Sequence, residues 1–377
     1  MAITVVGAGA IGGVTGAALA RAGQDVLLVD VAADHVAAVN AGGLTVETPQ
    51  GAWTARVRAV TPRELDGPLD LVLLAVKAQH TRDALETVAP RLAPDGTIVS
   101  LQNGLNEELI AARVGAARTV GCLVNWAADW VAPGRIQHGG SGAFVVGELD
   151  GTDSVRVKTL AALLDVVAPA RPTDNIWGYK WAKHAYGALL VATALVDAHV
   201  YDVAERSPAV QRTLVRLVAE GIAVAEAAGV RLEAFDEFEP AAYRAGAAGD
   251  EVAVRRCMAA VAAHYRAHTK TKTGIWRDLA VRKRKTEVEA HLGSTLAKAT
   301  GFGVPMPLTH RLLALIGDLE AGRRTMAWEN LDELAALSPE PDATGNSQVR
   351  GVRGRPLEGQ EGPRRPRNST VGTPPLG

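Results

Sequence analysis

Residues 3–12 read ITVVGAGAIG, and this stretch decides the fold of the N-terminal part of the chain. Its first four residues are apolar or β-branched, which predicts a short buried strand. The Gly-x-Gly-x-x-Gly motif that follows opens a helix, and a second apolar strand over residues 26–29 ends at Asp30. A glycine motif between a strand and a helix, with an acidic residue closing the next strand, is the fingerprint of a dinucleotide-binding Rossmann unit.

Each glycine of the motif has a separate physical role. Gly7 makes the tight turn, Gly9 lets the backbone approach a pyrophosphate, and Gly12 lets the helix lie close to the strand. The helix N-terminus adds unpaired N–H groups and the positive end of the helix dipole. The predicted cofactor contacts of the turn are Gly7, Gly9, Ala10, Ile11 and Gly12.

The end of the second strand predicts which dinucleotide is preferred. A carboxylate here, about 20 residues beyond the glycine motif, accepts hydrogen bonds from the ribose hydroxyls of NAD. The same carboxylate would repel the 2′-phosphate of NADP. No Arg or Lys occurs from Gln24 through Val39, and Asp34 adds a second negative charge. We therefore expect NAD, with NADP less favoured; the competing interpretation is that Asp30 caps the next helix.

Two further apolar strands, over residues 70–76 and 97–101, flank a helical pattern over residues 81–92. Strands that alternate with helices predict a parallel, doubly wound sheet. Lys77 follows the first of these strands, and Asn103 follows the second. Because the carboxyl ends of the strands border the ligand crevice of such a sheet, both side chains are expected to face the dinucleotide.

The remaining chain divides by composition. From residue 175 to about 334 it has apolar residues at helical spacing, and from residue 338 it is rich in Pro, Gly, Arg, Ser and Thr. A segment of that composition cannot offset its chain entropy by burial. The predicted fold class is α/β, with a Rossmann-type doubly wound sheet over residues 1–172, an all-helical domain over 173–337, and a disordered tail over 338–377.

The bulk composition excludes several classes of protein. The formal net charge is −1, so bulk electrostatics call for neither a nucleic-acid nor a membrane partner. Cys122 and Cys257 are far apart, which leaves no disulfide framework and no predicted metal site. Glycines interrupt the apolar N-terminus and no cation precedes it, so a signal peptide fits poorly. We expect a cytoplasmic protein, and whether it forms a homodimer is left open.

Several motifs, taken together, resemble the ketopantoate reductase family from residue 1 to about 334. Each is weak alone, but their order and spacing are specific. They are Lys77-Ala78, Asn103-Gly104, Pro133-Gly134 with His138-Gly139, Trp177 with Lys180, Asp278 with Thr286-Glu287, and Gly303-Val304 with Pro307.

This resemblance implies NAD(P)H-dependent reduction of a small 2-oxo acid to a 2-hydroxy acid. It implies that Lys180 is the general acid, and that Glu287 pairs with it and helps to hold the substrate. Asn103 and Lys77 would contact the nicotinamide ribose and the substrate end of the cleft. A positioned ammonium stabilises the charge that hydride addition builds on the carbonyl oxygen. The competing interpretations are a surface lysine at position 180 and a surface ion-pair network around Glu287.

The chain departs from the family pattern where the substrate binds. The family has asparagines four and eight residues after its lysine, and His184 and Ala188 stand at those positions here. Gly274 replaces a serine. His184 is either a substrate ligand or a buried structural histidine. Arg277 would hold a substrate carboxylate in a bidentate manner, or lie in a solvated basic loop. With these groups missing, we expect ketopantoate itself to be a poor substrate.

Two other functions fit the same architecture. One is an opine-type or 3-hydroxyacid dehydrogenase, and the other is a non-catalytic dinucleotide-binding regulator. Retention of Lys180, Asn103 and Glu287 favours an enzyme, whereas only the basic tail favours a regulator.

Overall fold

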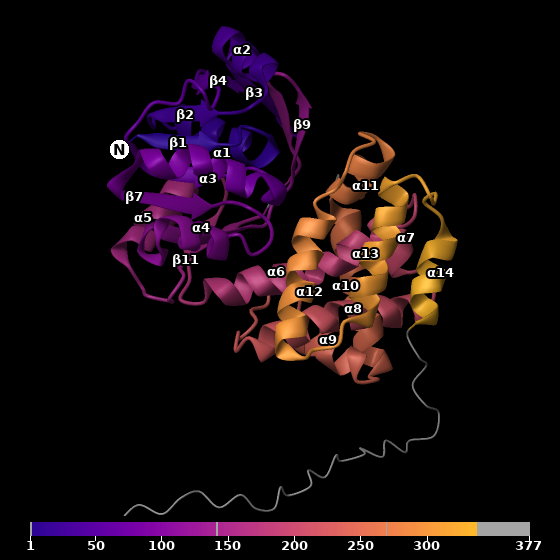
Figure 1. The fold of residues 1–377 in the computed structure, drawn as a ribbon. Helices are drawn as coiled ribbons and strands as arrows, with labels where there is room; N and C mark the ends of the chain where they lie inside the picture. The colour runs from indigo at the N-terminus through magenta and orange to yellow at the C-terminus, as the bar shows by residue number, and fades with distance from the viewer. Residues whose placement is uncertain (1, 141, 269, 338–377) are drawn as a thin grey trace, which may run out of the picture. The chain divides into compact units, whose positions relative to one another are not determined.

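The computed structural model describes residues 2–140, 142–268 and 270–337, and all of them belong to one compact unit. An α/β region comes first and an all-helical region follows, which confirms the predicted fold class (Figure 1). The disorder expected for residues 338–377 lies outside the described residues. Within the described part of the chain, no helix is both long enough and apolar enough to cross a membrane.

The main sheet is built around the strand that precedes the glycine motif. That strand, β1 (Ile3–Val6), lies parallel to and between β2 (Val26–Val29) and β6 (Leu69–Leu74). The strand order is β12-β11-β8-β7-β6-β1-β2-β5, with β11 antiparallel to β8. The other strands are β5 (Arg58–Val60), β7 (Leu92–Ser100), β8 (Thr119–Val124), β11 (Phe144–Glu148) and β12 (Ala170–Pro172). Strand β7 begins five residues before the predicted start at residue 97, because Leu92 also pairs with Leu69 across a register shift.

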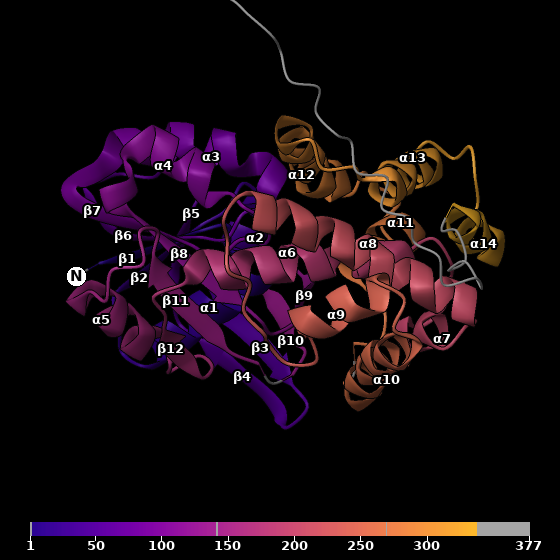
Figure 2. The ribbon, with the colours of Figure 1, turned by 90° about the horizontal axis from the view of Figure 1, so that it is seen from below.

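Helices cover both faces of this sheet, as a doubly wound fold requires. Helices α1 and α5 pack into one apolar core, and α3 and α4 pack into another (Figure 2). The helices are α1 (Ala10–Arg21), α2 (Ala33–Gly42), α3 (Thr81–Val88), α4 (Glu107–Val114) and α5 (Val155–Leu164). Short 3-10 turns are η1 (Ala78–His80), η2 (Ala89–Arg91) and η3 (Ala116–Arg118).

A second sheet of four strands has the order β4-β3-β10-β9. Its strands are β3 (Leu44–Thr48), β4 (Gly51–Ala55), β9 (Ala128–Ala132) and β10 (Arg135–His138). The β9–β10 hairpin turns at Pro133-Gly134, where Gly134 has a φ of 72° that a residue with a side chain rarely adopts. This hairpin matters for function because Asp129 of β9 pairs with residues of the helical region.

The helical region is organised around α6 (Ile176–Thr193), whose side chains are buried at most positions. Asn175 caps it by accepting the Gly178 N–H through its side chain at 3.1 Å. The remaining helices are α7 (Val200–Ala204), α8 (Pro208–Ala227), α9 (Pro240–Ala247), α10 (Glu251–Ala267), α11 (Gly274–Ala280), α12 (Val288–Phe302), α13 (Pro307–Glu320) and α14 (Trp328–Ala336). Because α6 also packs on β8 and β11, its polar side chains reach the edge of the main sheet.

Candidate active site

The glycine turn has the geometry that its sequence predicts. Gly7 has a φ of 93°, and a Cβ atom there would lie 2.7 Å from the Val76 nitrogen. A Cβ atom at Gly12 would lie 2.0 Å from the Gly7 oxygen, so α1 depends on this glycine for its close approach to β1. At Gly9 a Cβ atom would meet nothing within 4 Å. The turn is therefore packed tightly at Gly7 and Gly12 and open at Gly9, on the side where a pyrophosphate would bind.

A cleft of about 1180 Å³ runs from this turn to the helical region. Residues of the glycine turn, of the strand ends and of α6, α11 and α12 line it. Among them are Gly9, Asp30, Lys77, Asn103, Lys180 and Glu287. The fold thus brings the predicted cofactor residues and the predicted catalytic residues to one cavity.

Asp30 lies at the entrance to the cofactor end of the cleft. Its Oδ1 accepts a hydrogen bond from the main-chain N–H of Ala32 at 3.0 Å, but Ala32 is the N-cap of α2 and no side-chain hydrogen bond caps that helix, so Asp30 does not have the capping role of the competing interpretation. Asp30 nevertheless lines the cleft, and the neighbouring Val31 is 84% exposed. The carboxylate is therefore placed to meet a ribose, while one of its oxygens holds the turn before α2.

His35 hydrogen-bonds to the glycine turn. Its Nδ1 accepts the main-chain N–H of Gly134 at 3.0 Å, and its Nε2 lies 3.0 Å from the main-chain oxygen of Ala8. Because Nδ1 is the acceptor, Nε2 carries the proton and donates it to Ala8. One buried imidazole thus ties the cofactor turn to the β9–β10 hairpin, a link that the sequence reasoning did not identify.

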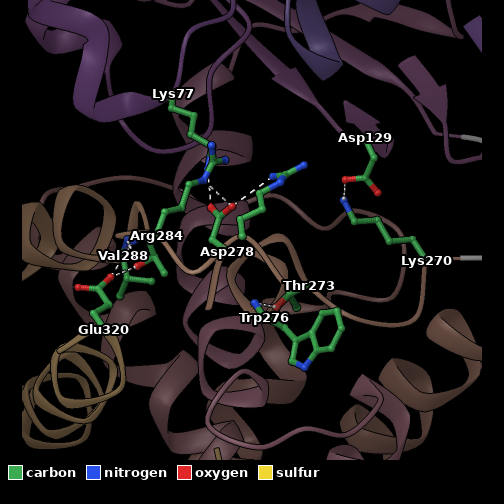
Figure 3. Close-up of polar contacts among 11 residues, drawn as sticks. Lys77, Asp129, Lys270, Thr273, Trp276, Asp278, Arg284, Val288 and Glu320 are labelled. Atoms are coloured by element: carbon green, nitrogen blue, oxygen red, sulfur yellow. Dashed lines mark hydrogen bonds and ion pairs between the residues drawn. The ribbon is translucent and has the colours of Figure 1, made fainter. Parts of the chain in front are cut away.

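Lys77 forms an ion pair with Asp278 of α11. Lys77 Nζ lies 2.6 Å from Asp278 Oδ2, and Arg284 Nε lies 2.9 Å from the other oxygen (Figure 3). Burial acts to raise the pKa of Asp278, but Lys77 and Arg284 outweigh it, so this pKa lies below its usual value. The Lys77 ammonium therefore joins the turn after β6 to α11, in addition to lining the cleft as expected.

Asn103 is exposed on the turn after β7 and lines the cleft. Its main-chain oxygen accepts the side-chain amide of Asn106 at 2.7 Å. Gly104 follows with a φ of 84°. The preceding Gln102 is buried, and its Nε2 donates to the main-chain oxygen of Val76 at 2.7 Å. The turn that carries Asn103 is thereby bonded to the turn that carries Lys77.

Lys180 occupies a different environment from the one that the resemblance implied. Its side chain is 3% exposed, and Nζ lies 2.6 Å from Oε1 of the fully buried Glu107. That contact has the distance of an ion pair but not the direction of a hydrogen bond, and Nζ donates instead to the main-chain oxygen of Gln102 at 2.7 Å. The partner of Lys180 is therefore Glu107 of α4, where Glu287 was expected.

A second lysine, one helical turn further along α6, faces the cleft more openly. Lys183 is partly exposed and donates from Nζ to the main-chain oxygen of Val124. Burial and the positive charge of Lys180 lower its pKa to about 8, against the opposing effects of Cys122, Asp236 and Glu287. The sequence reasoning missed Lys183; the available signal was its position three residues after Lys180, on the same face of the helix.

Glu287 stands immediately before α12, as its N-cap. Its side chain is partly exposed and lines the cleft, and its negative charge acts on Lys183. The predicted carboxylate is therefore at the site, beside a lysine other than the one expected.

His184 and His291 form a closely packed pair of tilted rings. The rings of His184 and His291 have centroids 3.8 Å apart, and His184 Nε2 contacts the hydroxyl of Thr295. Burial, His291 and Lys180 hold the pKa of His184 well below its usual value. Burial and the two lysines lower the pKa of His291 to about 4. Both rings are thus neutral at pH 7.

Of the two, His291 lies nearer the turn that carries Asn103. A Cβ atom at Gly104 would lie 3.7 Å from its ring, and one at Gly187 would lie 3.0 Å from it. His184 is only 2% exposed. The two interpretations offered for His184 remain open, although its contacts with Thr295 and His291 are those of a buried structural group.

Arg277 is paired with an acidic residue. Its guanidinium contacts Asp129 of β9. Asp129 also lies 3.4 Å from Lys270 Nζ (Figure 3). Lys272 lies 2.6 Å from Asp197 and packs on the ring of Trp276. The basic segment before and within α11 therefore neutralises carboxylates of this chain, so a substrate carboxylate would compete with Asp129 for Arg277.

The cleft also contains an acidic group beside a histidine. Asp236, Glu237 and His264 offer three oxygen and nitrogen atoms within 4.8 Å of one another. Glu237 accepts from the Tyr186 hydroxyl at 2.5 Å and lies 2.9 Å from His264 Nδ1. These contacts satisfy Glu237 within the protein, and its hydrogen bond to His264 raises the pKa of that histidine.

The fold and the site together define a class of protein. A glycine turn that opens a helix, an acid after the second strand, and lysines at the far end of the same cleft are the parts of an NAD(P)-dependent oxidoreductase. Comparison with known proteins agrees. The chain belongs to the ketopantoate reductase PanE/ApbA family: the family's model matches residues 3–151, and the model of its C-terminal domain matches residues 175–320.

Similar proteins confirm the predicted resemblance. A 2-dehydropantoate 2-reductase of Mesorhizobium japonicum is 33% identical over 258 residues, covering 61% of this chain and 78% of the relative. One from Halobacterium salinarum is 28% identical over 324 residues, covering 84% and 98%. Among solved structures, a PanE/ApbA family ketopantoate reductase from Ralstonia eutropha is 26% identical with a TM-score of 0.71, covering 86% of this chain and all of that one. D-mandelate dehydrogenase with NADH and anilino(oxo)acetate shares the fold at 23% identity and a TM-score of 0.74, covering 85% and 99%.

Proposed function

We propose that this protein reduces a 2-oxo acid to the 2-hydroxy acid, with Lys183 as the general acid and NADH as the preferred cofactor. The observation that carries the proposal is the position of Lys183. It is a partly exposed lysine at the substrate end of the cleft that begins at the glycine turn, and the charge of Glu287 acts on it.

The glycine turn fits a dinucleotide, because it is open at Gly9 and begins helix α1, whose first residues Ala10 and Ile11 line the cleft. When bound, the reduced nicotinamide supplies a hydride, which forms the new C–H bond at the carbonyl carbon. The carbonyl π electrons then move to oxygen. Lys183 stabilises that developing charge and transfers an Nζ proton to the oxygen, which completes the hydroxyl group.

Glu287 and Asn103 have supporting roles in this proposal. The Glu287 carboxylate favours the protonated form of Lys183 and so keeps the acid charged before reaction. Asn103, exposed on the turn after β7 and lining the cleft, would hold the nicotinamide ribose. Lys77 joins the two sides of that end of the cleft through its ion pair with Asp278. Its side chain is partly exposed and would also contact the ribose.

We propose that the substrate is a 2-oxo acid other than ketopantoate. The family asparagines stand four and eight residues after its acid lysine; counted from Lys183, those positions hold Gly187 and Val191, and Gly274 stands at the serine position, so hydrogen bonds to substrate oxygens are missing. Each lost neutral bond costs about 0.5–1.5 kcal/mol. The cleft wall beside Lys183 instead offers apolar and aromatic surface from Tyr186, Leu190 and Phe235, which favours an apolar substituent on the 2-oxo acid.

Oxidation of NADH in the presence of a panel of 2-oxo acids tests the proposal. The panel includes ketopantoate and acids with branched or aromatic substituents, each assayed with and without an amine. Turnover of apolar 2-oxo acids without amine supports it. Turnover that requires an amine would identify an opine-type enzyme. Tight NADH binding with no turnover on any acid would favour a regulator and contradict the proposal.

A further inference from the structure

Lys180 is a buried lysine that the proposed reduction does not use as its acid. Its ammonium is enclosed between α6 and α4, against Glu107 Oε1 at 2.6 Å and the main-chain oxygen of Gln102 at 2.7 Å. The side chains of the pair are 3% and 0% exposed. Burying two charges costs desolvation energy that their attraction does not reliably repay, so stability alone is a poor reason for such a pair.

The hydrogen bonds of Lys180 continue into both turns that border the nicotinamide end of the cleft. The Gln102 side chain donates to the Val76 main-chain oxygen at 2.7 Å and to the Thr81 hydroxyl at 2.8 Å. Val76 precedes Lys77, and Gln102 precedes Asn103. One ammonium is therefore bonded, through one buried amide, to the turn after β6 and the turn after β7.

We propose that Lys180 is a positioning residue for the reduction: its ammonium ties the Gln102–Asn103 turn to α6 and sets a second positive charge behind Lys183. This proposal rests on the proposed function of Lys183. It gives the buried pair with Glu107 a role, because the Glu107 carboxylate holds the Lys180 ammonium in place at 2.6 Å.

The two lysines are three residues apart on α6 and lie on the same face of the helix. After burial, the charge of Lys180 is the largest cause that lowers the pKa of Lys183 to about 8. Cys122 of β8, Asp236 of the α8–α9 connection and Glu287 at the start of α12 act in the opposite direction. Lys183 also faces the neutral His291. An amine whose pKa lies near the working pH is mostly protonated and still gives up its proton readily.

The pH dependence of kcat/KM tests the proposal. Because Lys183 acts in its protonated form, activity falls as the pH rises through its pKa. The variant carries Lys180→Met together with Glu107→Gln, since Lys180→Met alone would leave a buried carboxylate without its partner. Loss of the Lys180 charge should move the falling limb of this profile, the pH range in which kcat/KM declines, to higher pH by about half a pH unit or more. The looser turn should also lower kcat at pH 7 by about 3- to 10-fold. An unmoved limb would overturn the proposal.

Two further variants make the result specific. Glu107→Gln alone leaves Lys180 in place and removes a negative charge, so its limb should stay at or below the wild-type pH; a move upward would contradict the proposal. The matched control carries Lys298→Met with Glu108→Gln. It removes another lysine–glutamate pair anchored on α4, in which Lys298 Nζ lies 2.7 Å from Glu108 Oε2. Its limb should not move, and a shift as large as that of the Lys180 pair would contradict the proposal.

The parallel Lys183→Met variant separates the two proposals. If Lys183→Met retains near wild-type turnover, the proposed function of Lys183 fails, and the positioning role of Lys180 fails with it. If Lys183→Met is inactive while the limb of the Lys180 and Glu107 double variant is unmoved, only the role of Lys180 is overturned.

Discussion

Lys77 Nζ lies 2.6 Å from Asp278 Oδ2, and this ion pair joins the turn after β6 to helix α11 on the opposite side of the cleft. Asp278 is 1% exposed and also contacts Arg282 and Arg284. Three cations from two parts of the chain therefore converge on one buried carboxylate. The substrate end of the cleft depends on this contact for its shape.

The carboxylate of Asp278 should stabilise the protein at neutral pH and lose this effect in acid. Its pKa is lowered, because Lys77 and Arg284 outweigh the effect of burial. Such a group stabilises the fold above the pKa of the unfolded chain, about 3.9, and loses the effect as pH falls through the lower folded value. We expect Asp278→Asn to lower the free energy of unfolding at pH 7 by about 1–3 kcal/mol. Urea unfolding should show this difference shrinking below pH 4; an equal difference at pH 7 and pH 3 would contradict the account.

The Lys180–Glu107 pair should respond differently to single and double substitution. Lys180→Met leaves the buried Glu107 carboxylate unpaired, which typically costs about 3–5 kcal/mol. Adding Glu107→Gln removes the uncompensated charge, so most of that loss should be recovered. Urea unfolding of both variants at pH 7 measures the difference. Equal stability of the single and double variants would show that the two side chains are not a coupled buried pair.

Two glycines of the turn should give opposite results when replaced by alanine. Gly12→Ala places a Cβ atom 2.0 Å from the Gly7 oxygen, so it should unfold the turn and lower thermal stability. Gly9→Ala meets no protein atom within 4 Å, so the protein should fold normally. The added methyl group occupies the position that the pyrophosphate approaches, so NADH affinity should fall about tenfold or more. Fluorescence titration with NADH and thermal denaturation check both; unchanged NADH affinity in a folded Gly9→Ala variant would place the dinucleotide elsewhere.

NADH should be preferred over NADPH because of Asp30. One of its oxygens is bonded to Ala32, yet its carboxylate lines the cleft, where a 2′-phosphate would meet a negative charge. Asp30→Ala should therefore narrow the ratio of kcat/KM values for the two cofactors, mainly by improving NADPH. Steady-state kinetics at fixed substrate concentration decide this. A wild-type preference for NADPH would reverse the prediction.

The glycine turn and the strand order could be predicted from sequence because their requirements are local. Gly7 needs a positive φ and Gly12 needs close contact with a residue five positions away, and both follow from the motif itself. The placement of Lys77 and Asn103 beside one cleft could also be predicted, because strand ends of a parallel sheet share an edge. The family resemblance indicated Glu287 as the carboxylate of the same site.

The environment of Lys180 could not be predicted in the same way. Its partner, Glu107, comes from a helix 73 residues earlier in the chain, and no periodicity places a side chain of α4 under α6. Lys180 lines the cleft, but its side chain is 3% exposed because its ammonium is enclosed against Glu107. The sequence gives fewer indications of a role for Lys183, because its partial exposure depends on how α6 packs against β8. Arg277 likewise meets Asp129 through a contact between distant elements.

The most direct test of the account is the turnover of the Lys183→Met variant with the best 2-oxo acid of the panel, measured together with its affinity for NADH. If Lys183 supplies the proton, kcat should fall by about 10²-fold or more. The dissociation constant of NADH should stay within a few-fold of wild type, because the glycine turn is untouched. Near wild-type turnover in Lys183→Met would contradict the central claim.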